Sequence, residues 1–401
     1  MSRWICCQLG AREHYSIPRA ILHNQKEIYL YTDYWAGKRS VFFFYKKIRQ
    51  RFHNEIDRNH VNSWNTRFLC FELSARLAGR RGWCLTQARN KLFGKLVSRH
   101  LEKIIGRMAQ PPIVFAYSYA AREILKTAKS LGCPTILGQI DAGPVEMKLV
   151  KQLHEQAGIP LDDQPNEAYW TSWREECELA DLIMVNSHWS LSALKQTGVN
   201  PNKIKVIPLA YETQQQVKNV SDKSLVLSED RPLKVLFLGQ VILRKGILEL
   251  TEAIKIMVGK PVHWTIVGDG DSWLLDKLRN LPQTTVTGGV SRNEVGKFYG
   301  DADVFILPTH SDGYAITQLE AAAFGLPIIT SQFCGDIVRH KMDGLILPEV
   351  SVDAIVDAIT QLLDGHDKLT KYRENIRKRK FCTLRDLANN LDKIEESIVS
   401  T

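Results

Sequence analysis

The amino-acid sequence predicts an α/β protein made of two doubly wound domains whose parallel sheets face each other across a cleft. Two successive stretches of the chain alternate short apolar runs with helical patterns, which is typical of βαβ units and parallel sheets. The length of 401 residues, at about 150 residues per domain, also favours two domains.

The first domain is expected to span residues 1–212. Its strands are predicted from short apolar runs bounded by turn signals. These runs lie at residues 4–9, 28–31, 113–116, 135–140, 182–186 and 203–208. A basic helical insertion, about residues 36–110, separates the second of these strands from the third.

The second domain is expected to span residues 213–382, and the polar stretch Tyr211–Pro232 is predicted to be the linker that leads into it. Strands are predicted at residues 233–239, 262–268, 284–288, 303–308 and 326–330. Ser291 and Glu294 predict a capping box at the start of one helix. Residues 383–401 are expected to form a helix that packs back on the first domain.

Charge is distributed unevenly along the chain, which carries a formal net charge of +9. Residues 1–130 hold 24 Lys and Arg against 8 Asp and Glu, whereas the remainder holds 29 against 36. The first part therefore favours an anionic partner. Nucleic acid is not the predicted partner, because no nucleic-acid-binding module with interleaved aromatic residues is recognisable.

Two amphipathic patterns in the insertion predict helices with one apolar face. The apolar positions are 41, 44, 45, 48, 52 and 56 in the first pattern and 92, 93, 96, 97, 101, 104, 105 and 108 in the second. Core packing is the favoured interpretation of these faces, because most such faces are buried. The alternative is that the flanking lysines and arginines rest on an anionic membrane surface.

Several classes of protein are not favoured by the sequence. No apolar run approaches the ~20 residues that a membrane-spanning helix needs. The N-terminal residues do not form a signal peptide, and the eight cysteines contain no CxxC pair, so a zinc site is not expected. We expect reduced thiols and a cytoplasmic location, with the membrane surface as an alternative.

A cluster of cations follows the first strand of the second domain, and ligands of doubly wound sheets bind beyond the carboxyl ends of the strands. Gly239 is expected to allow a tight turn, and Arg244 and Lys245 precede a predicted helix. Two cations beside a helix N-terminus favour a diphosphate site, because the helix dipole and free N–H groups add to their charge. The alternative is a solvated charge pair.

Two carboxylates, Asp312 and Glu320, stand eight residues apart around the start of another predicted helix. Asp312 lies at the helix mouth and Glu320 about two turns inside, so they are too far apart to act on one water molecule. Carboxylates accept hydrogen bonds from vicinal hydroxyl groups, which sugars and ribose carry. We therefore expect the two acids to bind two parts of one elongated ligand.

The motifs together resemble the retaining family-4 glycosyltransferases of the GT-B fold, which consists of two Rossmann-like domains. The motifs are "GQVILRKGILEL", "VGDG", "GGVSRNEVGKFYGDADVFILPTHSDGYAITQLEAAAFGLPIITS" and "CGDIVRHKMDGLILP". The resemblance covers residues 232–350 and the segment 178–212, whereas residues 1–177 match only as a general fold.

The resemblance implies roles for individual residues. Arg244 and Lys245 would hold the donor's diphosphate, Glu320 would bind the ribose, and Asp312 would bind hydroxyls of the donor sugar. Val290 would line the base pocket. Further donor contacts would come from Gly10, from Gly239, and from backbone N–H groups at Gly313, Tyr314, Ala315 and Ile316.

Departures from the family's pattern fall at several of these positions. Asp312 stands where the family has Glu, Gln240 stands where Arg is common, and the glycine pair after the first strand is reduced to Gly10. Where the family often has His, this chain has "QIDAGP", which makes Asp141 an acceptor-side candidate together with His14. A structural surface histidine is the favoured alternative for His14.

The activity that the resemblance implies is retaining transfer of a hexosyl- or pentosyl-type sugar from a nucleotide-sugar to an acceptor hydroxyl. It needs no metal ion or cofactor, and a UDP-sugar is favoured over a GDP- or ADP-sugar. The acceptor is unknown, and a lipid-linked or membrane-associated one is the hypothesis. Two other functions stay open, a non-catalytic sugar-nucleotide-binding protein and a sugar-nucleotide epimerase of the same fold.

Overall fold

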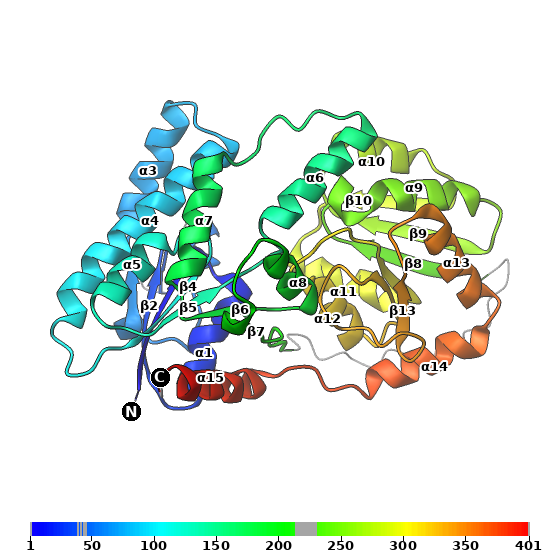
Figure 1. Cartoon of the computed structure of the whole chain (residues 1–401). Coiled ribbons are helices and arrows are strands. Elements are labelled where there is room, and N and C mark those ends of the chain that lie inside the picture. The colour runs from blue at the N-terminus through cyan, green and yellow to red at the C-terminus, as the bar shows by residue number, and fades with distance from the viewer. Residues whose placement is uncertain (1, 38–39, 41, 43–45, 213–230, 400–401) are drawn as a thin grey trace.

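The computed structural model describes residues 2–37, 40, 42, 46–212 and 231–399. Two sheet domains lie side by side, with helix α6 (Pro144–Ala157) between them (Figure 1). Most of the predicted linker, Tyr211–Pro232, and three positions of the first amphipathic pattern, Val41, Phe44 and Tyr45, fall outside the described residues.

The first domain is built on a seven-stranded parallel sheet with the order β3-β2-β1-β4-β5-β6-β7. Its strands are mostly buried aliphatic runs, packed by helices on both faces. The strands are β1 (Arg3–Gln8), β2 (Glu27–Thr32), β3 (Val61–Ser63), β4 (Ile113–Tyr117), β5 (Thr135–Gly138), β6 (Leu182–Val185) and β7 (Ile204–Val206). Strand β3 was not predicted, because three residues that include Asn62 and Ser63 form no apolar run.

The second domain is built on a six-stranded parallel sheet with the order β10-β9-β8-β11-β12-β13. The edge strand β13 was not predicted as a strand. The strands are β8 (Leu233–Leu238), β9 (Val262–Val267), β10 (Thr284–Gly288), β11 (Val304–Leu307), β12 (Ile328–Ser331) and β13 (Gly344–Leu347). The two sheets with their covering helices confirm the predicted fold class.

The helices follow the strands in the order expected of βαβ units. The first domain contains α1 (Ser16–His23), α2 (Lys46–Arg49), α3 (Asn65–Leu77), α4 (Gly82–Ile105), α5 (Arg122–Ser130), α7 (Glu167–Leu179) and α8 (His188–Gln196). The second contains α9 (Ile247–Ile256), α10 (Ser272–Arg279), α11 (Arg292–Asp301), α12 (Ile316–Ala323), α13 (Val352–Leu363) and α14 (His366–Arg377). The predicted capping box of Ser291 and Glu294 is present at the start of α11.

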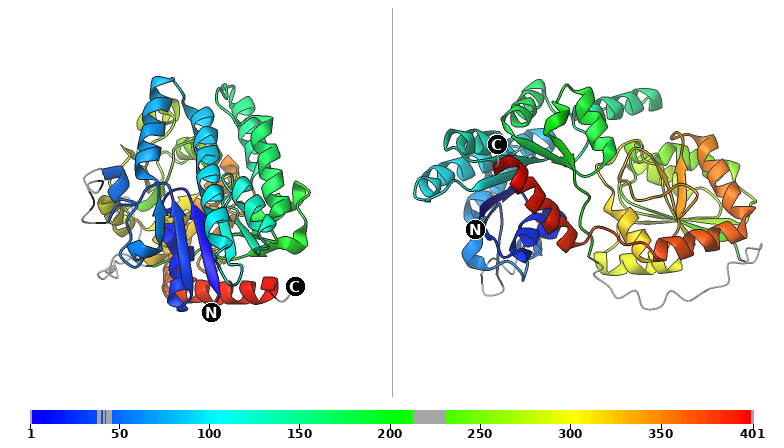
Figure 2. Two further views of the ribbon diagram at one scale, coloured as in Figure 1. Left: turned by 90° about the vertical axis from the view of Figure 1, so that its left-hand side faces the viewer. Right: turned by 60° about the horizontal axis from the view of Figure 1, so that its bottom comes forward.

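The chain returns to the first domain at its C-terminal end. Helix α15 (Leu384–Val399) lies along the first domain beside the N-terminal strand (Figure 2). Its Glu395 accepts a hydrogen bond of 3.0 Å from the indole Nε1 of Trp4 and pairs with Lys26 at 2.7 Å. Helix α15 therefore holds the two domains together at a second place besides the linker.

The two amphipathic patterns of the insertion have different outcomes. The second pattern forms α4, whose Phe93, Leu96 and Val97 are buried in the core of the first domain, so core packing is confirmed for this face. The first pattern forms only the short helix α2 within the described residues, followed by a turn at Arg51 and Phe52. None of the helices in the described ranges is long and apolar enough to cross a membrane.

Helix α6 belongs to the first domain by sequence but packs partly on the second. Leu153 is buried within the core cluster of the second domain, and Leu149 packs against the same cluster. Because α6 directly follows β5, this contact brings the carboxyl end of β5 close to the residues that follow β8 and β11.

Candidate active site

A cavity of about 540 Å³ lies between the two domains. Its walls come from the turn after β1, from helices α11 and α12, and from the segment that leaves β7. The residues that carry chemistry there are Glu13, His14, Arg19, Arg292, Tyr299 and Glu320, and the apolar lining includes Val290, Ile316 and Leu319. The sequence-predicted residues His14, Val290, Ile316 and Glu320 are thus brought to one cavity.

Glu320 lies in the second turn of α12 and faces this cavity. The hydroxyl of Tyr299 donates a hydrogen bond of 2.9 Å to its Oε2 atom. Burial raises the pKa of Glu320, and the hydrogen bond from Tyr299 acts in the opposite direction. The carboxylate is therefore oriented from one side and presents its other oxygen as an acceptor.

The turn after β1 carries His14 in a strained backbone. Glu13, His14 and Tyr15 have φ angles of 50°, 52° and 60°, a left-handed region that costs energy for residues other than glycine. The ring Nε2 of His14 lies 2.8 Å from Arg292 Nη2 of the second domain. Burial and then the charge of Arg292 lower the pKa of His14, so the neutral ring is favoured.

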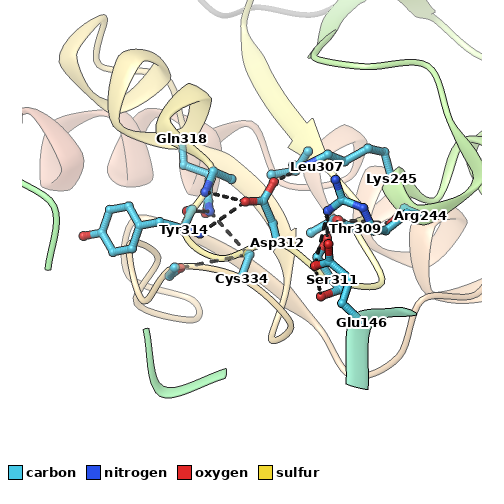
Figure 3. Close-up of polar contacts among 12 residues, drawn as sticks. Glu146, Arg244, Lys245, Leu307, Thr309, Ser311, Asp312, Tyr314, Gln318 and Cys334 are labelled. Atoms are coloured by element: carbon cyan, nitrogen blue, oxygen red, sulfur yellow. Dashed lines mark hydrogen bonds and ion pairs between the residues drawn. The ribbon is translucent and has the colours of Figure 1, made fainter. Parts of the chain in front are cut away.

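Lys245, Arg244 and Asp312 form a polar cluster just before α12 and do not line this cavity themselves (Figure 3). Lys245 is buried, and its Nζ pairs with Asp312 Oδ2. The other oxygen of Asp312 accepts hydrogen bonds from the backbone N–H groups of Tyr314 (3.2 Å) and Ala315 (2.9 Å). Burial raises the pKa of Asp312, but Lys245 and Arg244 together hold it below its usual range.

The start of α12 is shaped by one close approach between the domains. A Cβ atom at Gly313 would lie 2.1 Å from the carbonyl oxygen of Ile140 in the first domain, so this position admits only glycine. Ala315 adopts a φ of 59°, which turns the chain into the helix. The ring of Tyr314 is buried and points away from the cations (Figure 3).

Gly239 and Gly10 were both predicted to contact the donor, and neither lines the cavity. Gly239 lies at a bend directly after β8, but it has no left-handed φ, and a Cβ there would make only ordinary contact with Phe237, so the turn does not require glycine. The close approach is made instead by Gly268, where a Cβ would lie 1.8 Å from the Gly239 carbonyl oxygen. Gly10 has a φ of 81° and donates its N–H to Asp33 at 2.9 Å, but it does not line the cavity.

Glu146, which the sequence analysis did not single out, joins the two domains at the cation cluster. It lies in the first turn of α6, accepts a hydrogen bond of 2.6 Å from Ser311 Oγ, and lies 3.6 Å from Arg244 Nη1. Burial raises the pKa of Glu146 to about 7, against the opposing charge of Arg244. An acid in the first turn of a helix that follows "QIDAGP" was the only signal available in the sequence.

Asp141 is close to this cluster, but its side chain already accepts hydrogen bonds from residues of the first domain. Its Oδ1 atom accepts hydrogen bonds from the Gln139 amide and the Gly143 N–H, each at 2.9 Å, and from the Tyr119 hydroxyl. These bonds hold the turn between β5 and α6 in place. Asp141 therefore positions Glu146, and one oxygen remains for a ligand.

A family model for glycosyl transferases group 1 matches residues 220–379. Among curated relatives, the putative teichuronic acid biosynthesis glycosyltransferase TuaC of Bacillus subtilis is 32% identical over 198 residues, or 48% of this chain and 49% of that protein. The UDP-Gal:alpha-D-GlcNAc-diphosphoundecaprenol alpha-1,3-galactosyltransferase of Escherichia coli is 25% identical over 232 residues, or 54% and 59%. The chain thus spans only about half the length of these relatives.

Solved structures match the chain over its whole length. HepE of Anabaena, in complex with UDP, has a TM-score of 0.65 at 13% identity and covers 99% of this chain and 100% of its own. The catalytic domain of starch synthase IV from Arabidopsis thaliana has a TM-score of 0.66 at 11% identity and full coverage of both chains. These likenesses show the fold, which is of the GT-B type. The match to the glycosyl transferases group 1 model, over residues 220–379, falls largely on the second domain.

Proposed function

We propose that the protein is a retaining glycosyltransferase that moves a sugar from a nucleotide diphosphate to an acceptor hydroxyl without a metal ion. The observation that carries this proposal is the placement of Arg244, Lys245 and Asp312 at the start of α12, the helix that carries Ile316 and Glu320 into the cavity. A nucleotide-sugar has its diphosphate between the ribose and the sugar, and these residues supply two cations beside one carboxylate, Asp312, with a second carboxylate, Glu320, farther along the same segment.

Arg244, Lys245, Glu320 and Asp312 have different roles in the proposed reaction. As the sugar–phosphate bond breaks, negative charge grows on the leaving diphosphate, where Arg244 and Lys245 stabilise it. Glu320 accepts hydrogen bonds from the ribose, and Asp312 accepts them from hydroxyls of the sugar. The acceptor hydroxyl attacks from the face on which the diphosphate leaves, which retains the configuration, and its proton passes to the departing phosphate.

A UDP-sugar is the proposed donor class. The name of the E. coli relative contains UDP-Gal, and the HepE structure holds UDP. Other relatives are named as GDP-mannose-dependent, so the base pocket of this chain has to be tested directly. In this chain Val290 and Ile316 provide apolar surface beside Glu320, which suits a base stacked at the cavity wall.

A panel of UDP-, GDP- and ADP-sugars tests the proposal. We expect a UDP-sugar to raise the melting temperature of the purified protein and to be hydrolysed slowly when no acceptor is present. The absence of both stabilisation and hydrolysis with every UDP-sugar of the panel would contradict the donor assignment. Stabilisation without hydrolysis would identify a sugar-nucleotide-binding protein, and interconversion of two UDP-sugars would identify an epimerase.

We propose a lipid-linked acceptor and a place at the membrane surface for the intact protein. The E. coli relative is named for a diphosphoundecaprenol acceptor. In this chain, the end of α3 exposes Leu73 (62%) and Leu77 (82%) beside exposed Arg76, Arg80 and Arg81. Exposed leucines among cations suit the surface of an anionic bilayer, where each cation contributes about 1 kcal/mol.

Flotation with liposomes tests the membrane proposal. We expect the protein to float with vesicles of phosphatidylcholine and phosphatidylglycerol at low salt, and the double variant Leu73→Glu and Leu77→Glu to lose most of this binding. The matched control is Ile256→Glu with Val258→Glu, because these side chains are similarly exposed (59% and 49%) on the second domain. Equal flotation of both double variants would exclude the end of α3 as the contact.

A further inference from the structure

A second cavity, of about 350 Å³, lies between the start of α3 and the last turns of α4, on the first domain and outside the cleft. Trp64 and Leu96 give it an apolar base. The other residues that line it are all basic or imidazole side chains: Arg67, Arg99, His100 and Lys103. Its volume falls at the lower end of the ~300–1,000 Å³ that small-molecule sites occupy.

The cations of this cavity are unbalanced. No acidic residue lines it, and in the described part of the chain none of Arg67, Arg99 and Lys103 has a carboxylate at ion-pair distance. Arg89, three turns earlier on the same helix, shows the contrast, because it pairs with Glu72 at 2.8 Å. The three positive charges around this cavity repel each other. An anion that enters the cavity attracts all three cations and offsets their repulsion.

His100, the imidazole that lines the cavity, packs among aromatic rings. The ring of His100 packs edge-on against Tyr31 (5.5 Å between centroids) and Trp64 (6.3 Å). Burial and then the charge of Lys103 lower the pKa of His100. Two guanidinium groups supply the planar, forked donors that suit phosphate oxygens.

We propose that this cavity binds a phosphate-bearing anion, either the headgroup of an anionic lipid or a free phosphate compound. The site goes beyond the proposed transferase activity, because none of its residues lines the cleft. It lies at the base of the same α3–α4 hairpin whose other end exposes Leu73 and Leu77.

Nuclear magnetic resonance of the His100 ring gives a readout at the site itself. Inorganic pyrophosphate is expected to raise the pKa of His100, because a bound anion offsets the charge of Lys103. The His100 signal is assigned by its loss in His100→Gln. His263, in the second domain, serves as the reference whose pKa should not respond. Because His100 lies outside the cleft, pyrophosphate bound in the cleft should not shift the pKa of His100.

The control variants distinguish a specific binding site from nonspecific attraction by the positive charge of the protein. The triple variant Arg67→Gln, Arg99→Gln and Lys103→Gln changes three exposed side chains and is expected to abolish the His100 response. The control triple variant Lys260→Gln, Lys371→Gln and Lys378→Gln lowers the net charge equally by changing exposed lysines of the second domain, and it should leave the His100 response intact. A His100 pKa that ignores pyrophosphate, or that responds equally in both triple variants, would overturn the proposal.

Vesicles distinguish the two sources of the phosphate group. If the site holds lipid, the first triple variant should float at least 10-fold less with phosphatidylglycerol vesicles than the second triple variant. If both triple variants float alike while the His100 response to pyrophosphate persists in the wild type, the ligand is a free phosphate compound. Because neither measurement depends on turnover, both results stand even if the transferase assignment fails.

Discussion

Replacing Lys245 or Arg244 with alanine is expected to lower turnover by roughly 10²-fold or more, because each change removes a positive charge from the leaving diphosphate. Lys245 is buried beside Asp312, and Arg244 lies between the Ser311 carbonyl oxygen and Glu146. In such a partly desolvated place, a charge acts more strongly on a developing phosphate charge than it would in water.

The measurement is the rate of UDP-sugar hydrolysis or transfer at saturating donor, with thermal unfolding as the check on folding. Lys255→Ala is the matched control, because Lys255 lies on the next helix, α9, and forms an exposed pair with Glu252 at 2.8 Å. Its loss should change turnover by less than about 2-fold, as expected for an exposed pair. Near-normal turnover in both Lys245→Ala and Arg244→Ala would refute the diphosphate assignment.

Glu146 gives Arg244 an anionic partner from the other domain. The carboxylate reaches Arg244 and Ser311 because α6 packs on the second domain through Leu149 and Leu153. A donor diphosphate would compete with Glu146 for the same guanidinium group. Since burial places the pKa of Glu146 at about 7, protonation below that pH weakens its attraction for Arg244, and deprotonation above it restores the attraction.

The sequence predicted most of the strands that are buried apolar runs. Val, Ile and Leu at residues 233–238, 262–267 and 304–307 mark central strands of the second sheet. Edge strand β3 is short and contains Asn62 and Ser63, so its pairing depends on a neighbour rather than on its own composition, whereas β13 is a short apolar run that was missed. Residues 46–56 show the same limit, because helical spacing of apolar residues does not ensure a continuous helix when tertiary contacts favour turns.

Local motifs of the candidate site were visible in the sequence, whereas contacts between domains were not. Arg244, Lys245 and Asp312 each follow a strand, and Glu320 lies in the helix that begins shortly after Asp312, so their positions could be inferred from spacing. The contacts of Glu146 with Ser311 and of His14 with Arg292 join residues 165 and 278 positions apart. Such contacts depend on how the two domains pack against each other, and the periodicity of a single segment does not predict that packing.

Glu320→Ala and Asp312→Ala are expected to separate binding of the nucleotide from binding of the sugar. Glu320 lies on the cavity wall with Tyr299, at the position proposed for the ribose. A hydrogen bond to a charged group contributes about 1.5–3 kcal/mol, so Glu320→Ala should weaken binding of free UDP by roughly 10-fold to 100-fold. Glu320→Gln, which keeps one acceptor oxygen, should lose less.

Asp312→Ala should behave in the opposite way toward free UDP. Asp312 is paired with Lys245, so its removal leaves the ammonium group free to attract phosphate, and affinity for UDP should stay the same or rise. Hydrolysis of the UDP-sugar should nevertheless fall by roughly 10-fold or more, because the sugar loses its acceptor. The test is calorimetric titration of both variants with UDP, together with hydrolysis assays. An equal loss of UDP affinity in the two variants would show that the carboxylates do not bind separate parts of one ligand.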